Sequence, residues 1–177
     1  MKKLLYLLPV AMLVLAGCDS EEPDADDGPG EQELITQVRL SVGGQTFTWT
    51  DADGPGGGEP VFDTIRLAPN TAFPATVEFF NTIDDEDVTE EIREEDEEHQ
   101  VFFTIGGDIA GSTKITVTDA DENGLPIGLS FEMETGRATN GTLTVTLSHY
   151  DDAPKDGVTR SDETDIEVTY PVEVGVF

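Results

Sequence analysis

The six residues Asp119-Ala120-Asp121-Glu122-Asn123-Gly124 carry side chains that could bind a metal cation. They match the first half of an EF-hand loop, in which oxygen ligands alternate along the chain and a glycine makes the turn. The match then ends, because Ser130 stands where the loop needs a bidentate glutamate. Asp, Asn and Gly are also the usual residues of hairpin turns. The pattern therefore predicts either a calcium site formed by Asp119, Asp121 and Asn123 or an ordinary turn.

A second acidic loop is a weaker candidate for calcium. Asp51-Ala52-Asp53-Gly54 opens a glycine-rich stretch, and Asp51 and Asp53 would supply its carboxylate ligands. No further cofactor is indicated.

The sequence offers little for catalysis. His99 and His149 are the only histidines, and there is no HExxH motif, no second cysteine and no clustered histidine for a zinc site. His149 continues an apolar alternation, so we expect it to be partly buried near a strand end. No GxSxG motif is present, and among 38 acidic residues some carboxylate pairs must arise by chance. We therefore predict that the protein is not an enzyme.

Alternation of apolar and polar residues dominates the chain from residue 33 onward, which is typical of half-buried strands. Short strands separated by turn residues at this spacing predict an all-β, Ig-like β-sandwich of about nine strands. The expected strands cover residues 34–42, 46–50, 61–67, 73–79, 101–105, 115–117, 127–133, 143–147 and 166–170.

One segment departs from this alternation. Residues 84–98 hold 11 acidic side chains in 15 positions, and Val88 and Ile92 are four positions apart, on one helical face. Asp87 or Thr89 is suited to cap a helix. We expect one short acidic helix here.

The pattern of the first 32 residues indicates a segment that exports the protein and anchors it to a membrane, and no part of the folded domain. Lys2 and Lys3 precede an apolar run at residues 4–15, too short to span a bilayer, followed by small residues and the only cysteine, Cys18. The motif LAGC at residues 15–18 resembles the lipobox of bacterial lipoproteins, which implies cleavage after residue 17 and lipidation of Cys18. We expect a signal peptide at 1–17, a lipidated cysteine with a disordered acidic tether at 18–32, and a β-sandwich domain at 33–177.

Charge restricts the possible partners. After cleavage the chain keeps 7 basic and 38 acidic residues, a net charge of about −31. Nucleic acid and anionic membrane surfaces are repelled within a Debye length of roughly 8 Å at physiological salt. A metal cation or a basic protein would be attracted to the acidic loops. Adaptation to a salty habitat explains the same composition without any partner.

Strand parity predicts where the acidic residues gather. Consecutive antiparallel strands alternate in direction, so every second connection lies at the same end of the sandwich. The connections at residues 51–60, 82–99, 119–126 and 151–165 contain 23 of the 38 acidic residues and three of the basic ones. We expect these four connections, called the acidic end below, to lie together beside the start of the first strand.

The sequence resembles a group of poorly characterised lipoproteins from Gram-negative bacteria, some of which are labelled as a type 1 periplasmic-binding fold. That fold needs strands alternating with full helices over a longer chain, so we expect the sandwich instead. The resemblance supplies no catalytic residues. It rests on FTW at 47–49, DADG at 51–54, DTIRLAPNT at 63–71, EHQVFF at 98–103 and ETDIEV at 163–168.

Together these features predict a lipoprotein of the cell envelope that acts as a non-catalytic structural or binding module, held at the membrane by its lipid. The alternatives are a calcium-stabilised adhesion or interaction module and, less favoured, a hydrolase on a β-sandwich. Acidic residues after a lipidated cysteine resemble an export signal to the outer membrane, whereas Asp19 also fits a rule for retention in the inner membrane. We favour the outer membrane.

Overall fold

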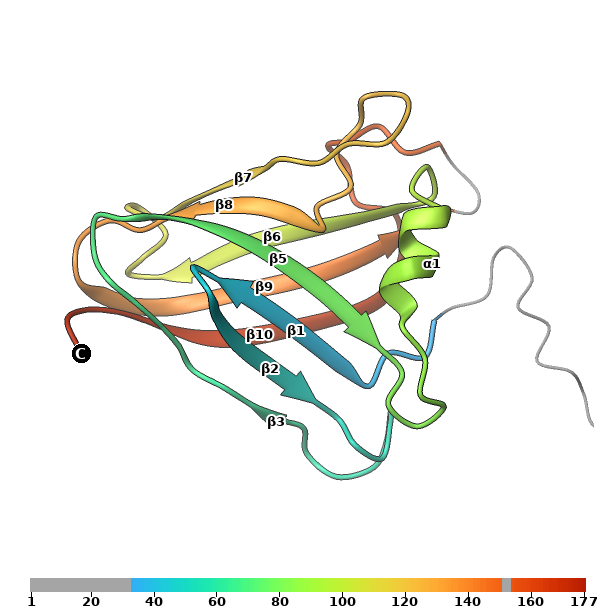
Figure 1. The fold of residues 1–177 in the computed structure, drawn as a ribbon, viewed down its shortest axis with the longest axis horizontal. Coiled ribbons are helices and arrows are strands. Elements are labelled where there is room, and N and C mark those ends of the chain that lie inside the picture. The colour runs from blue at the N-terminus through green and yellow to red at the C-terminus, as the bar shows by residue number, and fades with distance from the viewer. Residues whose placement is uncertain (1–32, 151–153) are drawn as a thin grey trace, which may run out of the picture.

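The computed structural model describes residues 33–150 and 154–177. The predicted signal peptide, Cys18 and the tether lie outside the described residues, as do Asp151 and Asp152 of the last acidic connection. Two β-sheets face each other across an apolar core, which confirms the all-β sandwich (Figure 1). Within the described ranges, no helix is both long enough and apolar enough to cross a bilayer.

Each sheet has a simple strand order, and neighbouring strands are antiparallel except β4 and β10, which are parallel. The larger sheet has the order β3 (Val61–Phe62), β2 (Gln45–Thr50), β1 (Gln37–Val42), β5 (Ala72–Phe80), β8 (Ser130–Glu134) and β7 (Lys114–Val117). The smaller sheet has the order β4 (Ile65–Leu67), β10 (Glu163–Val174), β9 (Thr139–His149) and β6 (His99–Gly107).

The apolar residues of the alternating pattern form the buried face of each sheet. Val38 and Leu40 of β1 are fully buried, as are Leu143 and Val145 of β9, so the core lies between the sheets. The expected strand at residues 34–42 begins too early, and Leu34 does not continue its buried face. β1 begins only at Gln37, and the Leu34 side chain, in the irregular chain before it, is 39% exposed.

The expected single strand at residues 61–67 is also wrong, because the structure divides it between the sheets. β3 pairs with β2 of the larger sheet, and β4 pairs with β10 of the smaller one. Asp63 lies between them, and its carboxylate accepts hydrogen bonds from the backbone N–H and the hydroxyl of Thr48. The described residues therefore form ten strands. Because the chain runs in the same direction through β3 and β4, the extra strand does not change which connections lie at which end of the sandwich.

The acidic helix is confirmed as α1 (Val88–Glu94). The carboxylate of Asp87 caps it by accepting a hydrogen bond from Thr89 N–H at 3.1 Å. Val88 and Ile92 are fully buried, and the Thr89 hydroxyl exchanges two hydrogen bonds with the backbone of Phe79 in β5. The helix thus covers one end of the sandwich.

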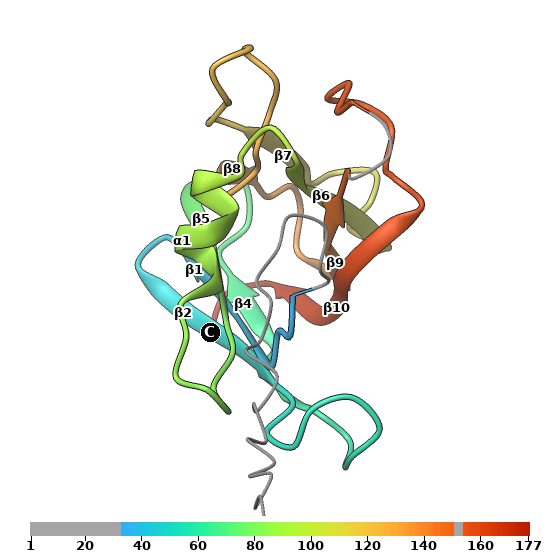
Figure 2. The same cartoon turned by 90° about the vertical axis from the view of Figure 1, so that its right-hand side faces the viewer.

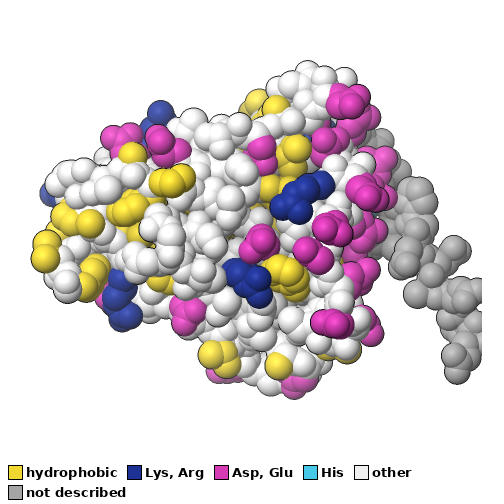
Figure 3. Space-filling view, viewed as in Figure 1, with side chains coloured by type: hydrophobic (Ala, Val, Ile, Leu, Met, Phe, Trp, Pro, Cys, Tyr) yellow, Lys and Arg dark blue, Asp and Glu magenta, His cyan; other side chains and the backbone are white. Residues whose placement is uncertain are grey.

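The described parts of the four acidic connections lie at that same end, as strand parity predicts. Gln37 pairs with both Thr50 and Phe80, so the connections after β2 and β5 leave the larger sheet together. In the smaller sheet His99 and Glu163 both pair with His149, which places the ends of β9, β6 and β10 side by side. Figure 2 shows this end facing the viewer, and Figure 3 shows acidic side chains gathered towards it.

Candidate functional site

The two histidines of the chain lie side by side at the acidic end of the sandwich interior. His99 is the first residue of β6 and His149 the last of β9, and the antiparallel register pairs them directly. Their rings stack with centroids 4.4 Å apart and planes inclined by 26°. His99 is fully buried and His149 is 3% exposed, so the expected burial of His149 near a strand end is confirmed and is more complete than predicted.

Asp165 completes the cluster from the third neighbouring strand. The pairing of β10 with β9 passes from Thr164–Ser148 to Ile166–Leu147, so Asp165 is the extra residue of a β-bulge. Such bulges change the direction of a side chain. Here the Asp165 side chain, 1% exposed, lies beside the stacked rings and near a nitrogen of each, with 3.9 Å from Oδ2 to His99 Nε2 and 3.8 Å from Oδ1 to His149 Nδ1.

Two glutamates extend this cluster towards solvent. The His99 Nδ1 lies 3.2 Å from the backbone oxygen of Glu95, and because that oxygen can only accept, Nδ1 carries the proton. The side chains of Glu95 and Glu98 lie 4.0 Å from His99 Nδ1 and His149 Nε2 respectively. Each imidazole therefore has the Asp165 carboxylate near one ring nitrogen and a glutamate near the other.

This arrangement has two chemical interpretations. Neutral imidazole nitrogens and a carboxylate oxygen are ligands for transition metals. Protonated imidazoles beside a carboxylate would instead form ion pairs. In the part of the chain that the structure describes, His99, His149 and Asp165 are the one group of three or more His, Cys, Asp or Glu residues whose ligand atoms lie within 4.8 Å of one another.

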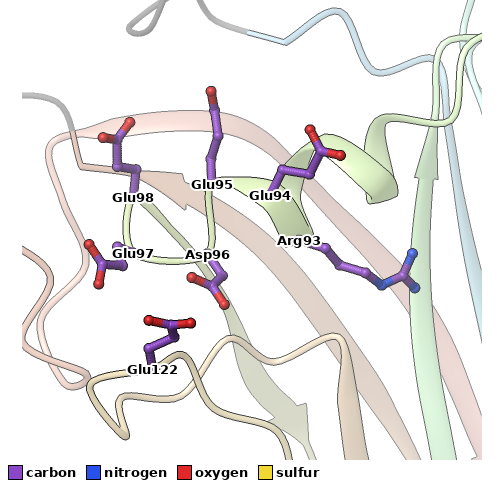
Figure 4. Close-up of a pocket in the computed structure, with 7 residues that line it drawn as sticks. All are labelled: Arg93, Glu94, Glu95, Asp96, Glu97, Glu98 and Glu122. Carbon is purple, nitrogen blue, oxygen red and sulfur yellow. The ribbon is translucent and has the colours of Figure 1, made fainter.

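An open hollow of about 470 Å³ lies beside the cluster. Figure 4 shows the carboxylates of Asp96 and Glu122 facing one space, while Glu95 and Arg93 point away from it. Its surface is thus almost entirely negative, and it would attract a cation. The residues that line it are Arg93, Glu94, Glu95, Asp96, Glu97, Glu98 and Glu122.

A buried lysine joins the loops around this hollow. Lys155 Nζ lies 2.8 Å from Asp121 Oδ2 and also donates to the backbone oxygens of Asp96 and His99. Burial alone would raise the pKa of Asp121, but its hydrogen bonds from Lys155, Leu125 and Asn123 outweigh burial and hold that pKa below its ordinary value. The pair fixes two acidic loops against the start of β6.

The predicted calcium ligands of the 119–124 loop already have partners. Both oxygens of Asp119 accept from backbone N–H groups, those of Gly128 and Ser130, each at 2.8 Å. Asp121 Oδ1 accepts from the N–H groups of Asn123 and Leu125, and the amide of Asn123 donates to Glu97. These are the contacts of a turn. Calcium binding here stays a prediction, and an ion beside Asp121 would have to replace Lys155.

The second predicted calcium loop lies in a different connection. The carboxylate of Asp53 accepts from Gly58 N–H at 2.8 Å, and the backbone N–H of Asp51 donates to Thr36. Among the described residues, neither Asp51 nor Asp53 belongs to a group of three candidate ligands. Calcium at this loop also stays a prediction.

The histidine cluster has no local signature in the sequence because its members are far apart along the chain. One usable signal existed: strand parity places His99, two residues before the predicted 101–105 strand, and His149, two residues after the predicted 143–147 strand, at the same end. No sequence signal pointed to Asp165, whose direction depends on the bulge.

Comparison with known proteins leaves the family open. The sequence matches no protein-family model and no curated protein. The resemblance to Gram-negative lipoproteins therefore stays a prediction.

Proposed function

We propose that this protein is a lipid-anchored lipoprotein of the cell envelope, and that it acts as a non-catalytic binding module whose acidic end takes a cationic partner. The observation that carries the proposal is the position of Glu33. This residue begins the described chain, and its pKa is raised to about 7 by partial burial and by the charges of Glu91, Asp165, Glu86 and Glu95. The described part of the chain thus begins beside the acidic loops.

For a lipid-anchored chain, the charge of the acidic end has a direct physical consequence. An anionic membrane surface repels it, so the domain is held away from the lipid by the length of the tether. A basic protein or peptide is attracted to the same loops. Such attraction raises the association rate constant more than it raises the affinity. The partner we propose is therefore a cationic peptide segment.

Burial supports a non-catalytic role. Hydrolysis by acid–base chemistry needs titratable groups that reach a substrate. The side chains of His99 and Asp165 are 0% and 1% exposed, and the open hollow beside them is lined by carboxylates and Arg93. We therefore favour binding over hydrolysis.

The anchor is tested by replacing Cys18 with serine. We expect the Cys18→Ser chain to move from the membrane pellet to the soluble fraction, because a chain without acyl groups lacks the CH₂ burial that holds a lipoprotein, about 0.8 kcal/mol for each CH₂. A variant that stays in the pellet after a high-salt wash would contradict the anchor.

The cationic partner is tested on the soluble Cys18→Ser chain with an oligolysine peptide. We expect binding that weakens as salt is added. Replacing Asp96 by Asn and Glu122 by Gln should weaken it about threefold to tenfold, since two exposed ion pairs are lost. The matched control replaces Glu132 and Glu134 of β8 by Gln, which removes the same charge from a strand outside the acidic end. Equal losses in both variants would show general charge attraction and no site at the acidic end.

A further inference from the structure

We propose that His99, His149 and Asp165 bind one divalent transition-metal ion of the zinc class. The inference concerns the interior of the acidic end, and it holds whether or not the exposed loops bind a cationic partner. It also differs from the predicted calcium loops, which use other residues.

The donor set decides the class of metal. Two imidazole nitrogens and one carboxylate oxygen suit zinc and its neighbours among the divalent transition metals. Calcium and magnesium prefer oxygen ligands throughout. A site made by His99, His149 and Asp165 should therefore select zinc or cobalt over calcium.

The distances are close to those that a bound ion needs. The three ligand atoms lie within 4.8 Å of one another. One carboxylate oxygen of Asp165 lies 3.9 Å from His99 Nε2, and the other lies 3.8 Å from His149 Nδ1. Tetrahedral zinc with bonds of about 2.0–2.1 Å places its ligands roughly 3.4 Å apart. Contraction by about an ångström would complete the geometry. Asp165 lies in a bulge and both histidines lie at strand ends, where the backbone can adjust.

The outer contacts of His99 are those of a metal ligand. Metal-binding histidines usually donate their second ring N–H to a carbonyl or carboxylate, which fixes the ring and leaves the other nitrogen free to bind. The Nδ1 of His99 donates to the Glu95 backbone oxygen, and its Nε2 is the ring nitrogen that lies near Asp165, at 3.9 Å from Oδ2. The Glu98 carboxylate lies in the corresponding position beside His149 Nε2.

Charge and access also favour a cation at this place. The Asp165 side chain is 1% exposed, and a cation bound beside it would be attracted by its charge in surroundings of low dielectric constant. The half-exposed side chains of Glu95 and Glu98 stand between the cluster and solvent, and both line the acidic hollow. Their charge would concentrate cations at the opening. A bound ion would join the ends of β6, β9 and β10 and offset the repulsion among the surrounding acids.

The binding test uses the Cys18→Ser chain after treatment with EDTA, titrated with Zn²⁺ alone in a calorimeter. We expect one ion per chain and a rise in melting temperature, because a ligand that binds only the folded state stabilises it. Co²⁺ should give the visible absorption of a site with nitrogen ligands, and excess Ca²⁺ or Mg²⁺ should not displace it. A titration without one-to-one saturation, or displacement by calcium, would overturn the proposal.

Single variants assign the ligands. Asp165→Asn and His149→Gln keep similar side-chain volumes, and we expect each to weaken Zn²⁺ binding by more than about tenfold, the loss that even an outer partner can cause. Glu122→Gln is the matched control, because it removes one acid from the hollow and leaves the cluster intact. His99→Gln is added if circular dichroism shows that it folds; otherwise the other two variants decide. Wild-type affinity in Asp165→Asn and His149→Gln, or an equal loss in Glu122→Gln, would refute the assignment.

Discussion

The ammonium of Lys155 lies 2.8 Å from the carboxylate of Asp121, and the two side chains are 1% and 0% exposed. Lys155 comes from the last acidic connection and Asp121 from the 119–126 loop, and the further hydrogen bonds of Lys155 reach the backbone oxygens of Asp96 and His99. One buried cation thus holds three acidic connections together. It opposes the mutual repulsion of the many acids at this end of the sandwich.

Replacing Lys155 by methionine should destabilise the protein strongly. Removal of one partner of a buried ion pair leaves the other charge unpaired, which costs about 3–5 kcal/mol. Unfolding in urea measures the loss. Lys114→Met is the control: Lys114 is exposed on β7, and we expect its change to stay within about 0.5 kcal/mol.

A double variant isolates the pair itself. Asn at position 121 still accepts from the N–H groups of Asn123 and Leu125, so Asp121→Asn should recover part of the loss in the Lys155→Met background. If the losses of the two single variants simply add, the pair contributes no coupling.

Glu33 should give a pH dependence near neutrality. Its pKa is raised to about 7 in the folded protein, from an ordinary value of 4.5. The folded state therefore holds this proton more tightly than the unfolded state, and the resulting stability is complete below pH 4.5 and is lost as the pH rises through 7. Because Glu33→Gln stays neutral, this variant should match the wild type at pH 4 and exceed its stability at pH 8. Urea unfolding at both pH values tests this, with exposed Glu59→Gln as the control.

The hydroxyl of Tyr170 joins the two sheets. Tyr170 of β10 is fully buried and donates a 2.9 Å hydrogen bond to the backbone oxygen of Val38 in β1. Tyr170→Phe leaves that oxygen without this donor, so we expect a loss of about 1–3 kcal/mol in the free energy of unfolding. An unchanged midpoint in urea would mean that water or another group satisfies Val38.

Replacement of Lys155 also tests the predicted binding of calcium to the 119–124 loop. Lys155→Met removes the positive charge beside Asp121, so calcium should raise the melting temperature of this variant more than that of the wild type. Thermal melts with and without millimolar calcium measure the difference. Identical shifts, or none in either protein, would leave this loop an ordinary turn.

Much of the fold could be predicted because it depends on local patterns. Period-two alternation identified the strands around Leu40 and Val145, and the cap at Asp87 with the spacing of Val88 and Ile92 identified the helix. Strand parity then placed the acidic connections at one end without any knowledge of contacts. The error at residues 61–67 arose because alternation reveals which face is buried and does not reveal which sheet a strand joins.

By itself, the sequence determined the sandwich class, the helix and the gathering of acids, because each depends on periodicity, capping or charge within short segments. Only the tertiary structure decided what those acids contact. The pairing of His99 with His149 depends on the register of two strands, and the direction of Asp165 depends on one bulged residue. The ion pair of Lys155 with Asp121 depends on how two loops fold over each other. A shift of one residue in register would reverse the face of every side chain in a strand, so these contacts follow from the packing of the whole sandwich.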